Sequence, residues 1–299
     1  MMSLGTHEGV RLGPQPERVS PLTLQVTDGV HRPEAIARAH DAVSRLAGIP
    51  SGVFWIRAAD VRAWHQGDLR PETALAAYFG ESLARFLFQH FARLIEALPL
   101  GWGTSYGCLE LWTKVVDSRR QTVWPHVDTV PLHDGWKSAC PSPMWGSVLY
   151  LSPEGQGHGD TVFCPQDPPS PAVLDLCMAE RTEEELRSTA TDWQRVRARP
   201  GRLVVFRGSL AHYVAPNLPQ TQAPRVTVLV NVWDQVPRFE APFEGPCRIT
   251  PEEFAAFARL PRAVVDLIAD GALALPDELL AQVDPADLEL VFAALLRLG

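Results

Sequence analysis

Short segments with period-two alternation dominate residues 105–233, and they constrain the fold more than any other feature of the sequence. Turns rich in Gly, Pro, Asp and Ser separate these segments. The expected strands lie at 108–115, 122–124, 146–151, 161–163, 203–206, 212–214 and 226–233. A parallel α/β sheet would need regular crossover helices between them, and the sequence offers none. The pattern therefore predicts a mainly β fold with a jelly-roll or cupin-like barrel.

Helical patterns flank this core on both sides in the sequence. Residues 33–46 have helical composition, and a stronger helix follows Pro71, with an apolar stripe in its later half that would pack on a sheet. Near the other end, Thr250-Pro-Glu-Glu253 has the form of a capping box, and Asp284-Pro285 starts a further helix. We expect helices to cover the β core.

Composition and charge exclude several classes of function. The 299 residues are 46% hydrophobic, enough for a sizeable core, and the net charge of −8 gives no attraction to nucleic acid or to anionic lipid. Five scattered cysteines lack metal-ligand or redox spacing, which is typical of reduced thiols. No segment has the pattern of a signal peptide or the length to span a bilayer. We expect a soluble cytoplasmic protein with neither nucleic-acid nor membrane partners.

His126 and Asp128 end a run of β-type sequence at 122–128. Side chains two residues apart on an extended segment point to the same face, so the imidazole and the carboxylate are aimed at one place. One further histidine would complete a facial triad of two histidines and one carboxylate, which binds Fe(II) and leaves coordination positions open. His212, which opens a later strand after a Gly-containing turn, is the candidate.

These pieces resemble, in order and character, the Fe(II)/2-oxoglutarate-dependent dioxygenases, particularly their prolyl-hydroxylase-like branch. The resemblance covers residues 105–235, under half of the chain. The matching pieces are 125–128, 147–152, 159–163, 201–212 and Arg225. Two intervals are longer than in the family pattern. We interpret them as insertions, a helical segment near 172–198 and a Pro/Gln-rich loop at 216–224.

The resemblance implies a double-stranded β-helix fold and a set of cofactors. It divides the chain into residues 1–104, an N-terminal helical and β segment packed on the core; 105–240, the catalytic core; and 241–299, a C-terminal helical extension. The implied cofactors are Fe(II), 2-oxoglutarate as co-substrate and O₂. The implied reaction hydroxylates an unactivated C–H bond and forms succinate and CO₂. Asp128 fills the carboxylate position, which favours hydroxylation over halogenation.

The resemblance also assigns roles to individual side chains. His126, Asp128 and His212 would hold the iron, and Arg225 would bind the distal carboxylate of 2-oxoglutarate, since a guanidinium fork binds a carboxylate in bidentate fashion. The Thr227 hydroxyl would contact the same carboxylate, and Tyr150 matches a tyrosine that contacts 2-oxoglutarate. The alternatives are that Thr227 is only a strand residue and Tyr150 only a core aromatic. Lys114 is a second candidate for the carboxylate, with a surface lysine as the alternative.

A substrate mouth is expected beside the metal, over 129–146 and the loop before Gly159. The segment follows Asp128 directly and is rich in proline, and its Trp136 and Trp145, with Trp124 before the ligands, offer large aromatic contact area. The alternative is that Trp136 and Trp145 only cap the barrel. The expected substrate is a small molecule or peptide-like, and an apolar stripe at 288–296 suggests packing on the barrel or a homodimer through the C-terminal helices.

Two other classes of function compete with the oxygenase. One is a non-catalytic cupin-like protein that binds a metal and regulates, which would need no anchor for 2-oxoglutarate, so Arg225 counts against it. The other is a metal-dependent isomerase or hydrolase on a similar barrel. Succinate formation from 2-oxoglutarate and O₂ separates all three.

Overall fold

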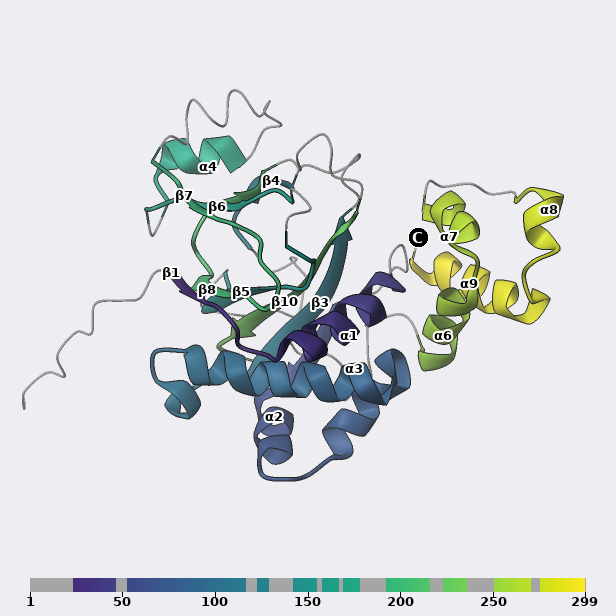
Figure 1. The fold of residues 1–299 in the computed structure, drawn as a ribbon, viewed down its shortest axis with the longest axis horizontal. Coiled ribbons are helices and arrows are strands. Elements are labelled where there is room, and N and C mark those ends of the chain that lie inside the picture. Colours follow the sequence, from purple (N-terminus) through teal and green to yellow (C-terminus); the bar gives the residue numbers. More distant parts are fainter. Residues whose placement is uncertain are drawn as a thin grey trace, which may run out of the picture.

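The computed structural model describes residues 24–46, 53–116, 123–128, 142–154, 158–166, 169–177, 192–215, 223–235, 250–269 and 275–298. Within these ranges the chain forms two antiparallel sheets with flanking helices (Figure 1), so the prediction of a mainly β core with helices around it is confirmed. The six-stranded sheet has the order β1-β8-β5-β10-β3-β2, and the four-stranded sheet has the order β4-β9-β6-β7. The strands are β1 (Leu24–Thr27), β2 (Phe54–Arg57), β3 (Cys108–Val116), β4 (Val123–His126), β5 (Trp145–Tyr150), β6 (Thr161–Phe163), β7 (Gln194–Val196), β8 (Leu203–Arg207), β9 (His212–Val214) and β10 (Arg225–Trp233).

From β3 to β10 the chain alternates between the two sheets, except that β6 and β7 follow each other in the same sheet. β3, β5, β8 and β10 belong to the six-stranded sheet, whereas β4, β6, β7 and β9 belong to the other. β1 and β2, from the N-terminal part of the chain, extend the six-stranded sheet at its two edges. The division of the chain into three segments remains a prediction.

The register of β10 fixes which side chains enter the space between the sheets. Val226, Val228, Val230 and Val232 belong to the apolar cluster shared with the helices. Side chains alternate along a strand, so Arg225 and the other odd-numbered residues of β10 face the second sheet. Tyr150 pairs with Thr227, and Phe163, from the other sheet, packs with Val148 and Phe206 in the interior cluster.

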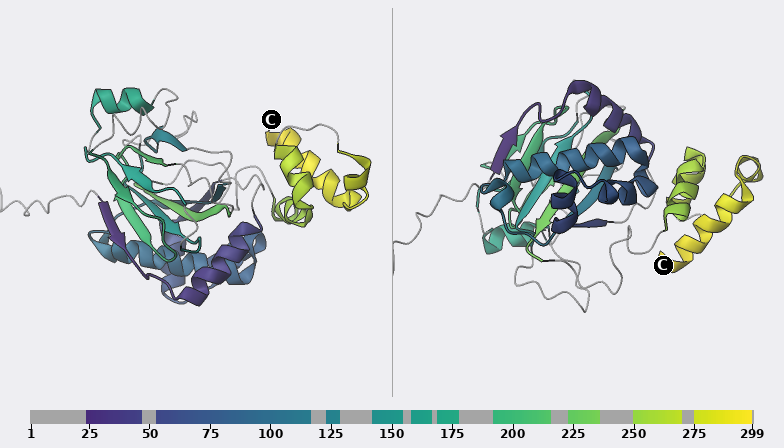
Figure 2. Two further views of the ribbon diagram at one scale, coloured as in Figure 1. Left: turned by 45° about the horizontal axis from the view of Figure 1, so that its top comes forward. Right: turned by 90° about the horizontal axis from the view of Figure 1, so that it is seen from below.

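Helices cover the outer face of the six-stranded sheet, as Figure 2 shows from below. They are α1 (Pro33–Ser44), α2 (Ala58–His65) and α3 (Arg70–Ala97), followed by the 3-10 turn η1 (Gly101–Gly103). The predicted apolar stripe of α3 is buried, with Leu83, Leu87 and Phe91 each at most 3% exposed. The helix is kinked at Gly80, whose φ of 74° suits glycine and not other residues. α2 was not predicted because its eight residues are too short for a periodic pattern.

The segment near 172–198 is a helix only in part. α4 (Pro171–Cys177) is helical, residues 178–191 lie outside the described ranges, and β7 is an edge strand. The prediction of a helix over 194–196 is therefore wrong. The sequence obscured β7 because it is only three residues long and its Gln194 and Arg195 are exposed, so hydrogen bonds to β6 define it and not an apolar pattern.

The C-terminal helices form a group beside the sheets and the N-terminal helices (Figure 1). They are α6 (Pro251–Arg259), α7 (Arg262–Ala269), α8 (Asp277–Leu280) and α9 (Pro285–Leu298). The predicted capping box is present, since Thr250 and Glu253 exchange hydrogen bonds at the start of α6. Phe254 packs against the rings of Phe54, Tyr78 and Phe79 and so joins α6 to β2 and α3. A homodimer through these helices remains a prediction.

None of the described helices combines the length and hydropathy that crossing a membrane requires. The described cysteines, Cys108, Cys164 and Cys177, are free thiols, in keeping with the sequence pattern.

Candidate metal centre

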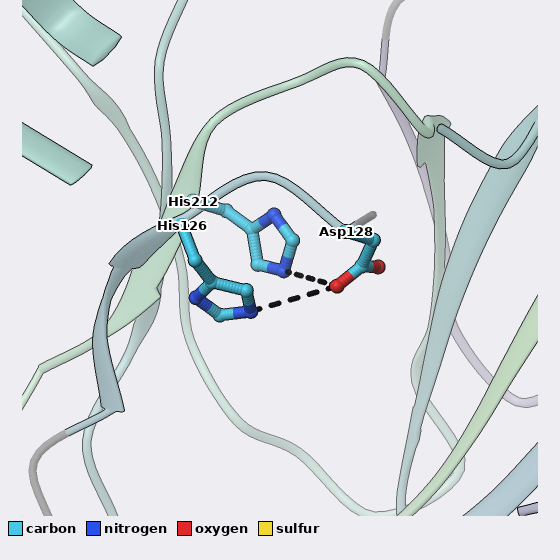
Figure 3. Close-up of side chains that lie close together, drawn as sticks. All are labelled: His126, Asp128 and His212. Carbon is cyan, nitrogen blue, oxygen red and sulfur yellow. Dashed lines mark ion pairs between the residues drawn. The ribbon is translucent and has the colours of Figure 1, made fainter. Parts of the chain in front are cut away.

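His126, Asp128 and His212 are brought together at the edge of the four-stranded sheet (Figure 3). Both histidines direct Nε2 toward one carboxylate oxygen, Asp128 Oδ1, at 3.5 Å from His126 and 4.0 Å from His212. β4 pairs with β9 so that the two histidines are opposite each other, while Asp128 lies two residues after the end of β4. The three ligand atoms lie within 4.8 Å of one another.

His212 is held with its metal-facing nitrogen free. Its Nδ1 lies 3.0 Å from the carbonyl oxygen of Leu210, and because a carbonyl only accepts, Nδ1 carries the proton and Nε2 keeps its lone pair. The rings of Phe163 and Phe206 pack against the imidazole, with centroids 5.7 and 4.8 Å away. Burial lowers the pKa of His212 to about 4, as does the charge of His126. At neutral pH the side chain is therefore uncharged and could act as a metal ligand.

The donor set fits a divalent metal ion, and so do the two spacings to Asp128. An ion about 2.1 Å from each ligand atom separates two such atoms by about 3 Å at a right angle and by at most about 4.2 Å. The two distances to Asp128 Oδ1 fall within that interval. Burial by itself raises the pKa of the Asp128 carboxyl, but the opposing effects of its neighbours, first among them the hydrogen bond from His126, outweigh it, so the pKa is lowered and the group is ionised.

Arg225 lies buried between the sheets, 3% exposed, at the start of β10. Its Nη2 donates a 2.7 Å hydrogen bond to Thr161 Oγ1, its guanidinium carbon lies 5.1 Å from the centre of the Tyr150 ring, and Tyr150 Oη shares a 2.6 Å hydrogen bond with Thr161. The Nε atom of Arg225 is buried and has no hydrogen-bond partner among the described residues. No carboxylate of the described chain forms an ion pair with this cation, and burial lowers its pKa. A buried guanidinium in this state is ready to receive an anion.

Thr227 lies two residues after Arg225 on β10, and Lys114 lies beside it on β3. They are opposite each other in the register of β10 and β3, and the same row contains Tyr150. The Thr227 hydroxyl donates to the carbonyl of Lys114 over a long 3.5 Å. Burial, followed by repulsion from Arg225, lowers the pKa of Lys114, while Asp128 opposes this shift. Two cations thus face the space between Tyr150 and the triad.

The three predicted substrate tryptophans are not brought together at the triad. Trp136 lies outside the described residues, and of Trp124 the structure describes the backbone in β4 but not the side chain. Trp145 is 6% exposed and belongs to the cluster on the helix side of the sheet, where Arg207 stacks over its ring at 4.9 Å. Trp145 and Tyr150 are five residues apart on β5, so alternation directs them to opposite faces. Its place in the mouth was therefore a wrong prediction.

Three polar residues of the site were not predicted. Thr161 links Arg225 to Tyr150, and Glu110 and Asn231 form a hydrogen-bonded pair beside Asp128. Glu110 had one indication in the sequence, a charged residue within the apolar run Cys-Leu-Glu-Leu-Trp. Thr161 and Asn231 had none, because their neighbours come from distant segments.

No family model and no curated protein matches the chain. Solved structures similar to it include a Pseudomonas putida prolyl-4-hydroxylase, at TM-score 0.38 and 12% identity, covering 72% of this chain and 94% of that one. AviO1 from Streptomyces viridochromogenes Tue57 matches at TM-score 0.44 and 18% identity, covering 76% and 96%. An N-substituted L-amino acid dioxygenase from Burkholderia ambifaria matches at 0.39 and 19%, covering 71% and 86%.

The resemblance expected from the sequence is thus present among solved structures. All of these TM-scores are below 0.5 and all identities are below 25%, so these likenesses carry no weight for the chemistry. The chemistry of the site is inferred from its own side chains.

Proposed function

We propose that this chain is an Fe(II)- and 2-oxoglutarate-dependent oxygenase that hydroxylates an unactivated C–H bond of an amino-acid or peptide-like substrate. Succinate and CO₂ are the co-products. The strand alternation between the two sheets is that expected of a double-stranded β-helix, and such a barrel carries its site between the sheets, where the triad and Arg225 lie.

One observation supports this function above the others, namely the state of Arg225. A cation that is 3% exposed, with a buried Nε lacking a partner, is costly to the fold unless a ligand completes it. A dicarboxylate that reaches from this guanidinium to a metal at the triad would complete it at one end and chelate the metal at the other. A binding protein that holds only a metal has no need of Arg225, which counts against a cupin-like regulator.

The residues then have distinct tasks. His126, Asp128 and His212 would hold the iron, which when bound supplies the oxidising power of the reaction. Arg225, held against Thr161 and Tyr150, would bind and orient the distal carboxylate of 2-oxoglutarate.

The other contributions come from the walls of the site. Lys114 adds a second positive charge on the same interior face, and Thr227 lies beside it. Phe163 and Phe206 keep water from the back of His212. The third class, an isomerase or hydrolase, would use the metal without the cationic end of the barrel.

Succinate formation tests the proposal. The iron-loaded protein, supplied with 2-oxoglutarate and O₂, should form succinate, and mass spectrometry of products from a substrate panel should find a gain of one oxygen atom. His126→Ala, Asp128→Ala and His212→Ala should each abolish iron binding and succinate formation. His65→Gln is the matched control, since His65 is exposed on α2 and stacks on Trp102. Full succinate formation by His212→Ala would contradict the proposal.

A further inference from the structure

Glu110 is a buried carboxyl group whose hydrogen bonding is incomplete. Its Oε2 accepts hydrogen bonds from Trp233 Nε1 at 2.8 Å and from Asn231 Nδ2 at 3.2 Å. None of the described residues donates a hydrogen bond to Oε1 or forms an ion pair with it, although the residue is only 7% exposed. Burial raises the pKa of Glu110 to about 7, against the effect of these two hydrogen bonds, and the charge of Asp128 raises it further.

A second glutamate in the same chain shows what completes such a group. Glu72, 6% exposed, also accepts a tryptophan N–H on Oε2, from Trp64 at 2.7 Å. Its Oε1 is occupied by the guanidinium of Arg85, whose Nε donates at 3.0 Å. The tryptophan bond is therefore common to both sites, and the cation is what Glu110 lacks.

The position of Glu110 is at the metal centre and not in a remote part of the core. Asn231 hydrogen-bonds to both the Glu110 and the Asp128 carboxyl groups. In the sheet register, Glu110 pairs with Asn231 and Asn231 pairs with Gly146. Gly146 in turn pairs with Phe206, whose ring packs on His212. Glu110 is thus in the row of the sheet that faces the triad.

The interior of the barrel is electrically polar along β3. Lys114 and Glu110 lie on the same face of this strand, four residues apart, which separates their Cα atoms by about 13 Å. Lys114 and Arg225 form a cationic end, while Asp128, together with Glu110 in its ionised form, forms an anionic region. A bound dicarboxylate uses the first. The anionic region remains for a positively charged group.

We infer that Glu110 Oε1 receives a positively charged nitrogen of the substrate. This inference rests on the proposed function and narrows its substrate class to molecules with an amine or guanidine close to the C–H bond that reacts. The nitrogen takes the place that Arg85 has at Glu72. Glu110 is then a specificity-determining residue that places the substrate on the side of the triad away from Arg225.

Paired compounds that differ in one charge test the inference. The full-length protein, loaded with Mn(II) and 2-oxoglutarate, is titrated calorimetrically with L-amino-acid amides, including those of lysine and arginine, and with their N-acetyl derivatives. At least one charged compound should bind at least tenfold more tightly than its uncharged acetylated counterpart, whether the charge lies on the α-amine or on the side chain. Glu110→Gln, which keeps an acceptor for Trp233, should remove that preference, while Glu110→Asp, which keeps the charge, should retain part of it.

Glu72→Gln is the matched control, and it should leave the preference unchanged because it removes an equally buried carboxylate elsewhere. The inference is overturned if no charged compound is preferred by the wild type, or if Glu110→Gln weakens charged and uncharged compounds equally. Titration of 2-oxoglutarate into the proteins loaded with Mn(II) alone, before the amines are added, separates failure of the proposed function from failure of the role of Glu110. If 2-oxoglutarate fails to bind, the proposed function fails; if it binds and the charge preference is missing, only the role of Glu110 fails.

Discussion

Arg225→Met should change ligand binding and the stability of the ligand-free protein in different ways. Methionine retains much of the length and apolar volume of the arginine stem but has no charge. In the ligand-free chain, no carboxylate of the described residues forms an ion pair with Arg225, although the charge of Asp160 attracts it, and its Nε has no hydrogen-bond partner among those residues. Replacing an arginine that pairs with carboxylates of the fold would leave those carboxylates without a counter-ion. Replacing an arginine that pairs only with a ligand would not.

The magnitudes follow from the contacts of the guanidinium. Loss of the Nη2 bond to Thr161 costs about 1.5–3 kcal/mol, and Thr161 keeps its hydrogen bond with Tyr150. Removing an unpaired buried cation recovers a desolvation penalty of several kcal/mol. The free energy of unfolding without ligand should therefore stay within about 2 kcal/mol of the wild-type value or rise. Loss of a bidentate carboxylate contact should weaken 2-oxoglutarate by about 3–5 kcal/mol, or at least about 100-fold.

Urea unfolding of the Mn(II)-loaded protein, with and without 2-oxoglutarate, measures both effects. At a concentration of 100 times its Kd, 2-oxoglutarate should stabilise the wild type by about 2.7 kcal/mol, and this increment should vanish in Arg225→Met. Arg207→Met is the control, since Arg207 stacks on Trp145 on the helix side of the sheet, and it should keep the increment. Destabilisation of ligand-free Arg225→Met by more than about 4 kcal/mol, or an unchanged increment, would refute the reasoning.

Three further substitutions test other parts of the structure. Gly146→Ala would place a Cβ 2.5 Å from Cζ of Phe206, whose ring packs on His212. Metal affinity, measured by titration, should therefore fall about tenfold or more. An unchanged affinity would contradict this coupling. His90, fully buried, has its pKa lowered by burial to about 3, so below pH 6.5 only the unfolded chain binds its proton and stability falls as pH falls. His90→Leu should reduce the slope of the unfolding free energy near pH 5 by about 1.4 kcal/mol per pH unit, and an unchanged slope would be a refutation. Phe254→Ala should lower the unfolding free energy by about 3–5 kcal/mol because it removes a ring packed on three others; a loss below about 1 kcal/mol would show that α6 is not docked there.

Local features could be predicted from the sequence. Period-two segments gave most strands of the core, and the proline and capping-box patterns gave the starts of α1, α3, α6 and α9. It also identified His126 and Asp128 as a pair, because residues two apart on a strand share a face whatever the rest of the chain does. Alternation on β5 likewise separates Trp145 from Tyr150, so the wrong place given to Trp145 was avoidable from the sequence.

Contacts between distant segments could be seen only in the tertiary structure. β7 is defined by its hydrogen bonds to β6, and His212 joins the triad because β9 pairs with β4. The partners of the buried charges are decided in the same way. Whether Glu110 faces a cation, as Glu72 faces Arg85, or only neutral donors depends on the strand that packs beside it. Such contacts join residues that are far apart in the chain, so no local sequence pattern predicts them. Hydrogen bonding and burial depend on which groups are close in space, and not on their separation along the sequence.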